Sequence, residues 1–231
     1  MGNRCSLKTI GRAGLFLLRS FVAQELSILV IQVERGSELV IDGDRVNMGS
    51  QEPVTCRLEL ISESALYTQR LGRWLGELLH GGELLLLDGQ LGAGKTTFTQ
   101  GLAKGMNIYA VVNSPTFTLL KEYWREPSGQ AVLPARDTQA LYHFDLYRLD
   151  EPEEMFDLGF EEYFDGLGVC VVEWADKATE FWPAERLYIH LSILDEVKRD
   201  LKRELLFVAT GSRYCELLRQ FQKKIYATVS S

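Results

Sequence analysis

The chain has 231 residues and a hydrophobic content of 46%, enough for one sizeable globular domain with an extension. Its net charge of −7 argues against a protein that grips nucleic acid over a broad surface, so any link to RNA is expected to run through a partner. No apolar stretch approaches the roughly 20 residues that span a membrane. The four cysteines form no C-x-x-C pair and indicate neither a zinc site nor a disulfide framework, as expected in the reducing cytoplasm.

Residues 1–55 are expected to form an N-terminal extension, either poorly ordered or used for targeting. Residues 1–24 contain no acidic residue but four basic ones, Arg4, Lys8, Arg12 and Arg19. An acid-poor, arginine-bearing start is typical of transit peptides, which would place the protein in an organelle. The start Met1-Gly2 also fits the loose myristoylation pattern. We favour a third interpretation, a non-essential extension ahead of Met48, because short targeting patterns often match by chance.

Residues 56–225 alternate between strand and helix patterns and are expected to form the main domain. A first strand pattern leads to Ser62, which is placed to cap a helix that ends at Gly81. The four leucines at 84–87 predict a strand buried on both faces. Residues 97–104 have helical composition, and a glycine follows them as an end signal.

The second half of the domain continues the alternation. Its expected elements are an extended segment (117–124), a surface loop (125–140), a strand (141–147), a helix start (150–153), a buried strand (168–172), an antiparallel pair at one edge (187–193 and 204–210) and a closing helix (214–224). This order predicts an α/β fold, a P-loop NTPase-like sandwich with a mainly parallel sheet and an antiparallel edge.

The most informative motif lies between the leucine strand and the following helix. Gly89, Gly94, Lys95 and Thr96 fit the pattern G-x-x-x-x-G-K-[ST]. Glycines let a backbone curl around phosphate, its N–H groups point inward, and the helix dipole adds positive potential. Lys95 would neutralise the outer phosphates, and the Thr96 hydroxyl would bind Mg²⁺. The flanking strand and helix patterns disfavour a chance match, so we expect a nucleoside triphosphate site.

Two carboxylates are candidates for the chemistry. Glu173 follows the buried strand at its C-terminal end, where ligands gather in open α/β sheets, and could hold Mg²⁺ or simply end a strand. On a strand, His143, Asp145 and Tyr147 would share one face. Asp145 could then order an attacking water, or equally tie its strand to a neighbour through a His or Arg. The hydroxyls of Ser114-Pro-Thr are a weaker signal for a switch-like turn.

These motifs together resemble the TsaE family over roughly residues 56–222. The motifs are Gly89-Gln-Leu-Gly-Ala-Gly-Lys-Thr-Thr97, Ser114-Pro-Thr-Phe-Thr-Leu119, His143-Phe-Asp-Leu-Tyr-Arg-Leu149 and Val172-Glu-Trp174. Many NTPases share the first motif, but the last two joined together are quite specific. That family is the small ATPase component of the bacterial machinery that makes threonylcarbamoyladenosine in tRNA, beside the anticodon.

The resemblance implies an ATP- and Mg²⁺-dependent ATPase that is weak without partners. It implies that the ATP phosphates lie on the loop residues Gly92, Ala93, Gly94, Lys95, Thr96 and Thr97. Thr96 and Glu173 would hold Mg²⁺, Asp145 would be needed for hydrolysis together with Lys95, and the Ser114 and His143 segments would act as switch regions. The family works by binding TsaD and TsaB subunits, which hydrolysis resets between turnovers, so tRNA is reached only through that complex.

Two positions depart from the family, and three alternatives stay open. Gln90 stands where the family usually has Asp or Asn, and the match of Arg203 to a late Gly-Arg is doubtful.

A small-molecule kinase would use the same loop, although no arginine cluster follows Glu173. A GTPase-like switch lacks an Asn-Lys-x-Asp motif. A module that binds ATP without hydrolysing it is the third alternative.

Overall fold

The computed structural model describes residues 22–23, 26–34, 53–125, 140–151, 154–157, 159–194 and 202–229. For 22–34 it describes the backbone alone. Residues 126–139 of the predicted loop and most of the predicted N-terminal extension therefore lie outside the described residues, and Ala140, predicted as the end of that loop, is the first residue of a strand. Within the described part of the chain, no helix combines the length and the apolar character that a membrane crossing requires.

In the described residues, nine strands form one sheet in the order β1-β2-β3-β9-β8-β4-β7-β6-β5. In chain order the strands are β1 Val22–Ala23, β2 Leu26–Glu34, β3 Thr55–Ser62, β4 Leu84–Asp88, β5 Leu120–Trp124, β6 Ala140–Asp145, β7 Val169–Glu173, β8 Arg186–Ile193 and β9 Arg203–Thr210. The central strands β8, β4, β7 and β6 are parallel, and the flanking pairs are antiparallel. The predicted α/β class is confirmed, although the antiparallel part exceeds a single edge.

The predicted antiparallel pair forms, but its predicted place at the edge is wrong. Strands β8 and β9 pair with Ile189 opposite Phe207, and β3 and β2 continue the sheet beyond β9. Strand β2 comes from the segment predicted as an extension, where no strand was expected. Its run of β-branched and other apolar residues favours a strand, and pairing with β3 gives its backbone hydrogen-bond partners. A domain boundary at residue 56 remains a prediction.

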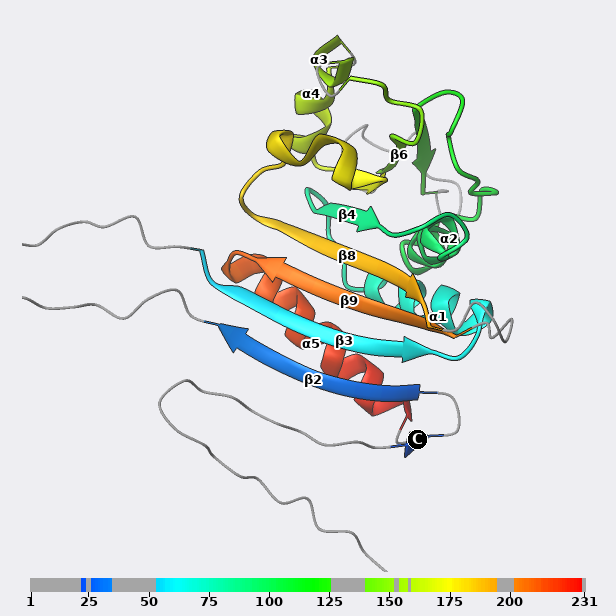
Figure 1. The fold of residues 1–231 in the computed structure, drawn as a ribbon, viewed down its shortest axis with the longest axis vertical. Coiled ribbons are helices and arrows are strands. Elements are labelled where there is room, and N and C mark those ends of the chain that lie inside the picture. The colour runs from blue at the N-terminus through cyan, green and yellow to red at the C-terminus, as the bar shows by residue number, and fades with distance from the viewer. Residues whose placement is uncertain are drawn as a thin grey trace, which may run out of the picture.

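Helices cover both faces of the parallel centre (Figure 1). They are α1 Ala65–Gly76, α2 Lys95–Gly105, α3 Glu154–Asp157, α4 Phe160–Phe164, the 3₁₀ helix η1 Ala175–Phe181 and α5 Ser212–Val229. Helices α1, α2 and α5 form one hydrophobic core with the sheet, and α3, α4 and η1 contribute to a second on its other face. Every residue of β7 is consequently buried, whereas β8 and β9 alternate between buried and partly exposed residues.

The predicted cap of the first helix was wrong by two residues. Ser64 is the N-cap, and its hydroxyl accepts a hydrogen bond from the Tyr67 N–H at 3.1 Å. Ser62 instead ends β3, where its hydroxyl is buried and bonds to Thr68 Oγ1 at 2.9 Å. The helix also ends at Gly76, earlier than the predicted Gly81.

Helices α1 and α2 pack backbone against backbone. Each carries two glycines four residues apart on the shared face: Gly72 and Gly76 on α1, Gly101 and Gly105 on α2. A Cβ atom at Gly101 would lie 2.0 Å from the Gln69 carbonyl oxygen, far inside van der Waals contact. This close approach fixes the start of α2 relative to the sheet, and the functional site lies at that start.

Candidate functional site

The site lies where three parallel strands end at the same edge of the sheet. Strand β4 ends at Asp88 and continues into the glycine loop, β7 ends at Glu173, and β6 ends at Asp145. In the register, Glu173 pairs with both Leu87 and Asp145. Because the carboxyl ends of parallel strands meet at one edge, the loop and both acids predicted from the sequence are brought together.

The loop backbone has the shape that an anion site needs. Gly89, Gly92 and Gly94 have φ angles of 130°, 79° and 108°, which side-chain-bearing residues rarely adopt. A Cβ atom at Gly89 would also lie 2.0 Å from the Leu191 carbonyl oxygen. Gly94 is the N-cap of α2 and has no side chain to bond the first-turn N–H groups, among them that of Thr97. Those donors remain available for phosphate.

Lys95 folds back over its own loop. Its Nζ donates to the carbonyl oxygens of Gly89 and Gln90, the second at 3.2 Å, and lies 3.6 Å from the centre of the Trp174 ring. Only 5% of the residue is exposed. Burial lowers the pKa of Lys95, and the nearby charge of Glu173 partly opposes that shift. An ammonium group held over the loop suits the recognition of phosphate.

Thr96 and Glu173 place two oxygens side by side. Thr96 Oγ1 donates to Glu173 Oε2 at 2.9 Å, and Glu173 is buried, with 2% exposed. In nucleotide sites, Mg²⁺ usually has only one or two protein ligands, and phosphates and waters supply the others. A hydroxyl and a carboxylate can be those two ligands. Among the described residues, no group of three or more His, Cys, Asp or Glu could hold a metal ion alone. The pair therefore fits Mg²⁺ bound together with a nucleotide, and not a metal site built from protein ligands alone.

The other oxygen of Glu173 has partners that the sequence did not reveal. His143 Nε2 lies 2.8 Å from Glu173 Oε1, and Thr99 Oγ1 lies 3.5 Å from the same atom. Thr99 also donates to the Lys95 carbonyl oxygen, one turn earlier on α2. Thr99 could have been found from the sequence, because it lies four residues after Lys95 and therefore on the same face of the helix.

Asp145 is held by a turn and not by a charged partner. Its Oδ2 accepts hydrogen bonds from the hydroxyls of Ser114 and Thr116, the second at 2.8 Å. Its Oδ1 accepts from the Tyr147 N–H at 2.9 Å. The alternative of a His or Arg pair is not observed among the described residues. Strand β6 ends at Asp145, so Tyr147 does not share a strand face with His143, contrary to the prediction.

A second carboxylate cluster lies on the opposite face of the sheet. Asp88 Oδ2 accepts from Tyr188 OH at 2.7 Å and lies 2.9 Å from His190 Nδ1, while Oδ1 accepts from the Gly89 N–H at 2.6 Å. Burial raises the pKa of Asp88, but these hydrogen bonds more than offset it, so the pKa is lowered. The charged side chain thus anchors the first glycine of the loop.

Arg203 supports the outer side of the loop, although its match to the family was doubtful. Its Nε donates to the Ala93 carbonyl oxygen at 3.1 Å, and a terminal nitrogen donates to that of Gly92 at 3.4 Å. Ala93 is itself fully buried. Because a peptide group points its C=O and N–H in opposite directions, these contacts aim the Gly94 N–H away from Arg203.

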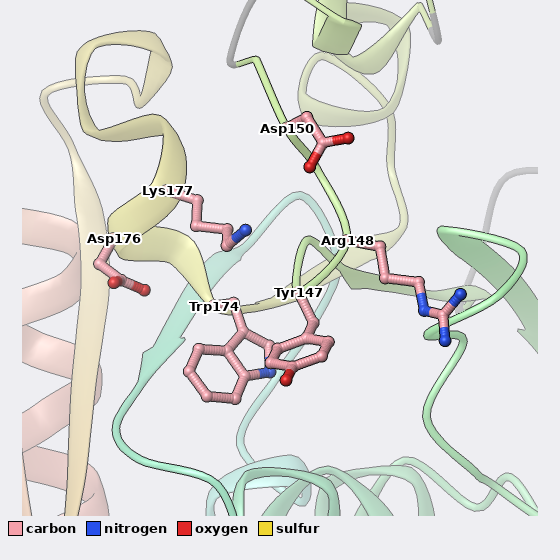
Figure 2. Close-up of a pocket in the computed structure, with 6 residues that line it drawn as sticks. All are labelled: Tyr147, Arg148, Asp150, Trp174, Asp176 and Lys177. Carbon is pink, nitrogen blue, oxygen red and sulfur yellow. The ribbon is translucent and has the colours of Figure 1, made fainter.

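An open pocket of about 750 Å³ lies next to the loop lysine. Figure 2 shows its lining residues: Tyr147, Arg148, Asp150, Trp174, Asp176 and Lys177. The rings of Tyr147 and Trp174 lie 5.0 Å apart at an angle of 51°. Arg148 extends away from them, over the ring of Phe117 at 4.2 Å. The pocket therefore combines an aromatic surface with side chains of both charges.

A sheet with a parallel centre, whose strand β4 runs through a glycine loop into α2, defines an α/β fold of the P-loop NTPase type. The profile of the family described as threonylcarbamoyl adenosine biosynthesis protein TsaE matches residues 62–203. The chain belongs to the TsaE family. Strands β1 and β2 lie before the matched residues.

Individual relatives agree with this assignment. A Bacillus subtilis protein named tRNA threonylcarbamoyladenosine biosynthesis protein TsaE is 49% identical over 142 residues, which are 59% of this chain and 78% of the relative. A protein of the same name from Treponema pallidum is 40% identical over 144 residues, 62% of this chain and 98% of the relative. The crystal structure of Bacillus subtilis YdiB superposes with a TM-score of 0.57 at 36% identity, covering 72% of this chain and 95% of that one.

Proposed function

We propose that this protein is a Mg²⁺-dependent ATPase that serves the synthesis of threonylcarbamoyladenosine in tRNA. The hydrogen bond between Thr96 Oγ1 and Glu173 Oε2, next to the free N–H groups of α2, is the observation that carries the proposal. With it, two oxygens that would serve as magnesium ligands lie beside donors that would bind an anion, at the carboxyl edge of the sheet. The biosynthetic process in this proposal is taken from the names of the relatives.

Each side chain then has a distinct part. The first-turn N–H groups of α2 and Lys95 would bind the phosphates, and Thr96 with Glu173 would hold Mg²⁺. ATP bound there with Mg²⁺ would supply the phosphoanhydride bond that is hydrolysed. Asp145, with two hydroxyls and one N–H already bound, would orient the water. Trp174 would shield Lys95 from solvent.

The ATPase is proposed to act on a complex of TsaD- and TsaB-type subunits and to reset it between turnovers. Large hydrophobic side chains are exposed on the segments that flank the site, which supports a protein partner there: Leu91, Tyr109, Val111 and Phe117. Phe117 is 82% exposed and follows directly after Thr116, a partner of Asp145. A subunit that binds this segment would therefore act on the acid that orients water, and the acidic chain would meet tRNA only indirectly.

The experiment is phosphate release from ATP by the purified chain, with and without TsaD and TsaB subunits, at varied Mg²⁺. We expect the chain by itself to release inorganic phosphate slowly. Release should be faster when the subunits are added, and none should occur without Mg²⁺. Release that is equal with and without Mg²⁺ would contradict the metal site. Release unaffected by the subunits would contradict the proposed partners.

One observation keeps a small-molecule kinase as the second candidate. The open pocket beside Lys95 carries Arg148 and Lys177, and a kinase needs an acceptor pocket next to the transferred phosphate. Its mixed charges favour no particular acceptor. The same assay separates the two functions, because an ATPase gives phosphate to water, whereas a kinase gives it to an added metabolite.

A further inference from the structure

The buried pair formed by His143 and Glu173 is not explained by phosphate binding. His143 lies on β6, is fully buried, and has Nε2 at 2.8 Å from Glu173 Oε1. Its ring packs near that of Tyr123, with centres 6.5 Å apart. A polar ring placed this deep in a hydrophobic core costs stability unless its polar atoms are hydrogen-bonded, and among the described residues Nδ1 has no partner.

The hydrogen bonds fix which ring nitrogen carries the proton. Glu173 accepts from Thr96 at Oε2, and a carboxylate can only accept at Oε1 as well, so His143 Nε2 must donate. Among the described residues, His143 Nδ1 has no hydrogen-bond partner. A proton on Nδ1 would therefore be buried without an acceptor, which is costly. Nε2 is therefore the ring nitrogen that donates, and its acceptor is Glu173 Oε1.

We propose that His143 is a positioning residue that sets the orientation of the Glu173 carboxylate for the metal ion. Because His143 holds Oε1, the other oxygen is directed toward Thr96, where the second proposed ligand lies. Thr99 contacts Oε1 at 3.5 Å, at the limit of a hydrogen bond, and cannot replace this contact. Losing a hydrogen bond that orients a metal ligand typically lowers metal affinity about 10- to 100-fold.

This inference rests on the proposed function, since it concerns how tightly the same site binds Mg²⁺. The test measures the Mg²⁺ concentration at half-maximal binding of a fluorescent ATP analogue. In His143→Leu, which has no donor, we expect that concentration to rise about tenfold or more. In His143→Gln, whose amide nitrogen can reach the position of Nε2, it should return most of the way to the parent value. Binding of the analogue without Mg²⁺ should be unchanged in both variants.

A double-mutant cycle separates positioning from simple packing. If His143 acts through Glu173, then adding His143→Leu to Glu173→Gln should leave binding of the analogue, at any Mg²⁺ concentration, as it is in Glu173→Gln alone. Additive effects would overturn the proposal, as would a parent-like midpoint in His143→Leu. Should His143→Leu fail to fold, His143→Asn takes its place, because its amide reaches only the position of Nδ1 and should behave like the leucine variant.

The controls keep the two proposals apart. If the parent protein binds the analogue with Mg²⁺ and His143 variants do not differ from it, only the role of His143 is wrong. If the parent binds no ATP analogue at any Mg²⁺ concentration, the proposed function and this inference both fail.

Discussion

Two carboxylates lie side by side at the edge of the sheet, yet the structure holds them in different ways. Glu173 is bonded by His143 on the neighbouring strand and by Thr96 on a helix pinned by backbone contact. Asp145 is bonded by the hydroxyls of Ser114 and Thr116, which lie outside helices and strands and are partly exposed. The proposed metal ligand is thus preorganised by the core, whereas the acid proposed to orient water depends on a surface turn. A partner that bound the surface turn would therefore act on Asp145 and not on Glu173.

The largest expected effect separates the two acids directly. In Asp145→Asn, turnover should fall about 10²- to 10⁴-fold, because the water loses its oriented acceptor. Mg²⁺-dependent binding of ATP should be kept in that variant. In Glu173→Gln, turnover should also fall, but binding should become largely independent of Mg²⁺. Phosphate release and calorimetric titration with and without Mg²⁺ give both quantities.

The opposite pattern would contradict the division of roles. If Asp145→Asn removed the Mg²⁺ dependence of binding, Asp145 would be the metal ligand. If Glu173→Gln kept full activity at ordinary Mg²⁺, the carboxylate of Glu173 would be structural.

The next effect concerns the phosphate site that both acids serve. Lys95→Ala should weaken ATP binding by about 1.5–3 kcal/mol, a tenfold to hundredfold change, because a charge-assisted contact to phosphate is lost. Lys104→Ala removes the same charge near the other end of α2 and serves as the control, with affinity expected to stay at the parent value. Isothermal titration measures both, and equal affinities would contradict the loop assignment.

The fixed position of Thr96 next to Glu173 depends on the contact between α1 and α2. Gly101→Ala should lower the free energy of unfolding by about 1–3 kcal/mol, because the new Cβ would meet the Gln69 carbonyl oxygen at 2.0 Å. Gly166→Ala is the matched control, since its Cβ would have only ordinary contacts from 3.4 Å outward. Urea denaturation of both variants measures the difference. Equal stabilities would mean that α2 is not pinned by this contact.

On the turn side, removing the two hydroxyls should have a smaller and selective effect. Ser114→Ala combined with Thr116→Val should reduce turnover by a few-fold to tenfold, the size of one typical hydrogen bond of about 1 kcal/mol, because the Tyr147 N–H still holds Asp145. The Mg²⁺ midpoint should not move, because Glu173 keeps its own partners. A shifted midpoint in steady-state titrations would show that the two regions are coupled and not separate.

The smallest effect is a pH dependence of ATP binding. Burial lowers the pKa of Lys95 in the free protein, and bound phosphate would raise it again. Above the lowered pKa, binding must therefore take up a proton, so affinity should fall as pH rises through that range. Titrations in buffers of different ionisation enthalpy would detect the proton. Lys95→Ala should lose this dependence, and its persistence there would assign the proton to another group.

The parallel centre of the sheet and its two acids could be predicted from the sequence. Apolar runs mark the buried strands, and each acid lies at the end of such a strand. The leucines at 84–87 and the run at 168–172 are apolar throughout, as strands covered on both faces must be. A carboxylate placed just after such a strand reaches the ligand edge whatever the loops do, as Glu173 does.

What the sequence did not reveal depends on tertiary placement. Ser62 and Ser64 are equally good caps by residue type, and only the end of β3 decides between them. Strand β2 follows shortly after the first 24 residues, whose basic composition favours a targeting segment over a strand. The contact of His143 with Glu173 joins residues 30 positions apart, so no local pattern encodes it.

A crystal structure with a non-hydrolysable ATP analogue and Mn²⁺ in place of Mg²⁺ is the most direct test of the site. The anomalous signal of the metal should lie between the phosphates and the oxygens Thr96 Oγ1 and Glu173 Oε2. A nucleotide bound away from the loop at 89–94, or a metal ion that touches neither oxygen, would contradict the proposed chemistry.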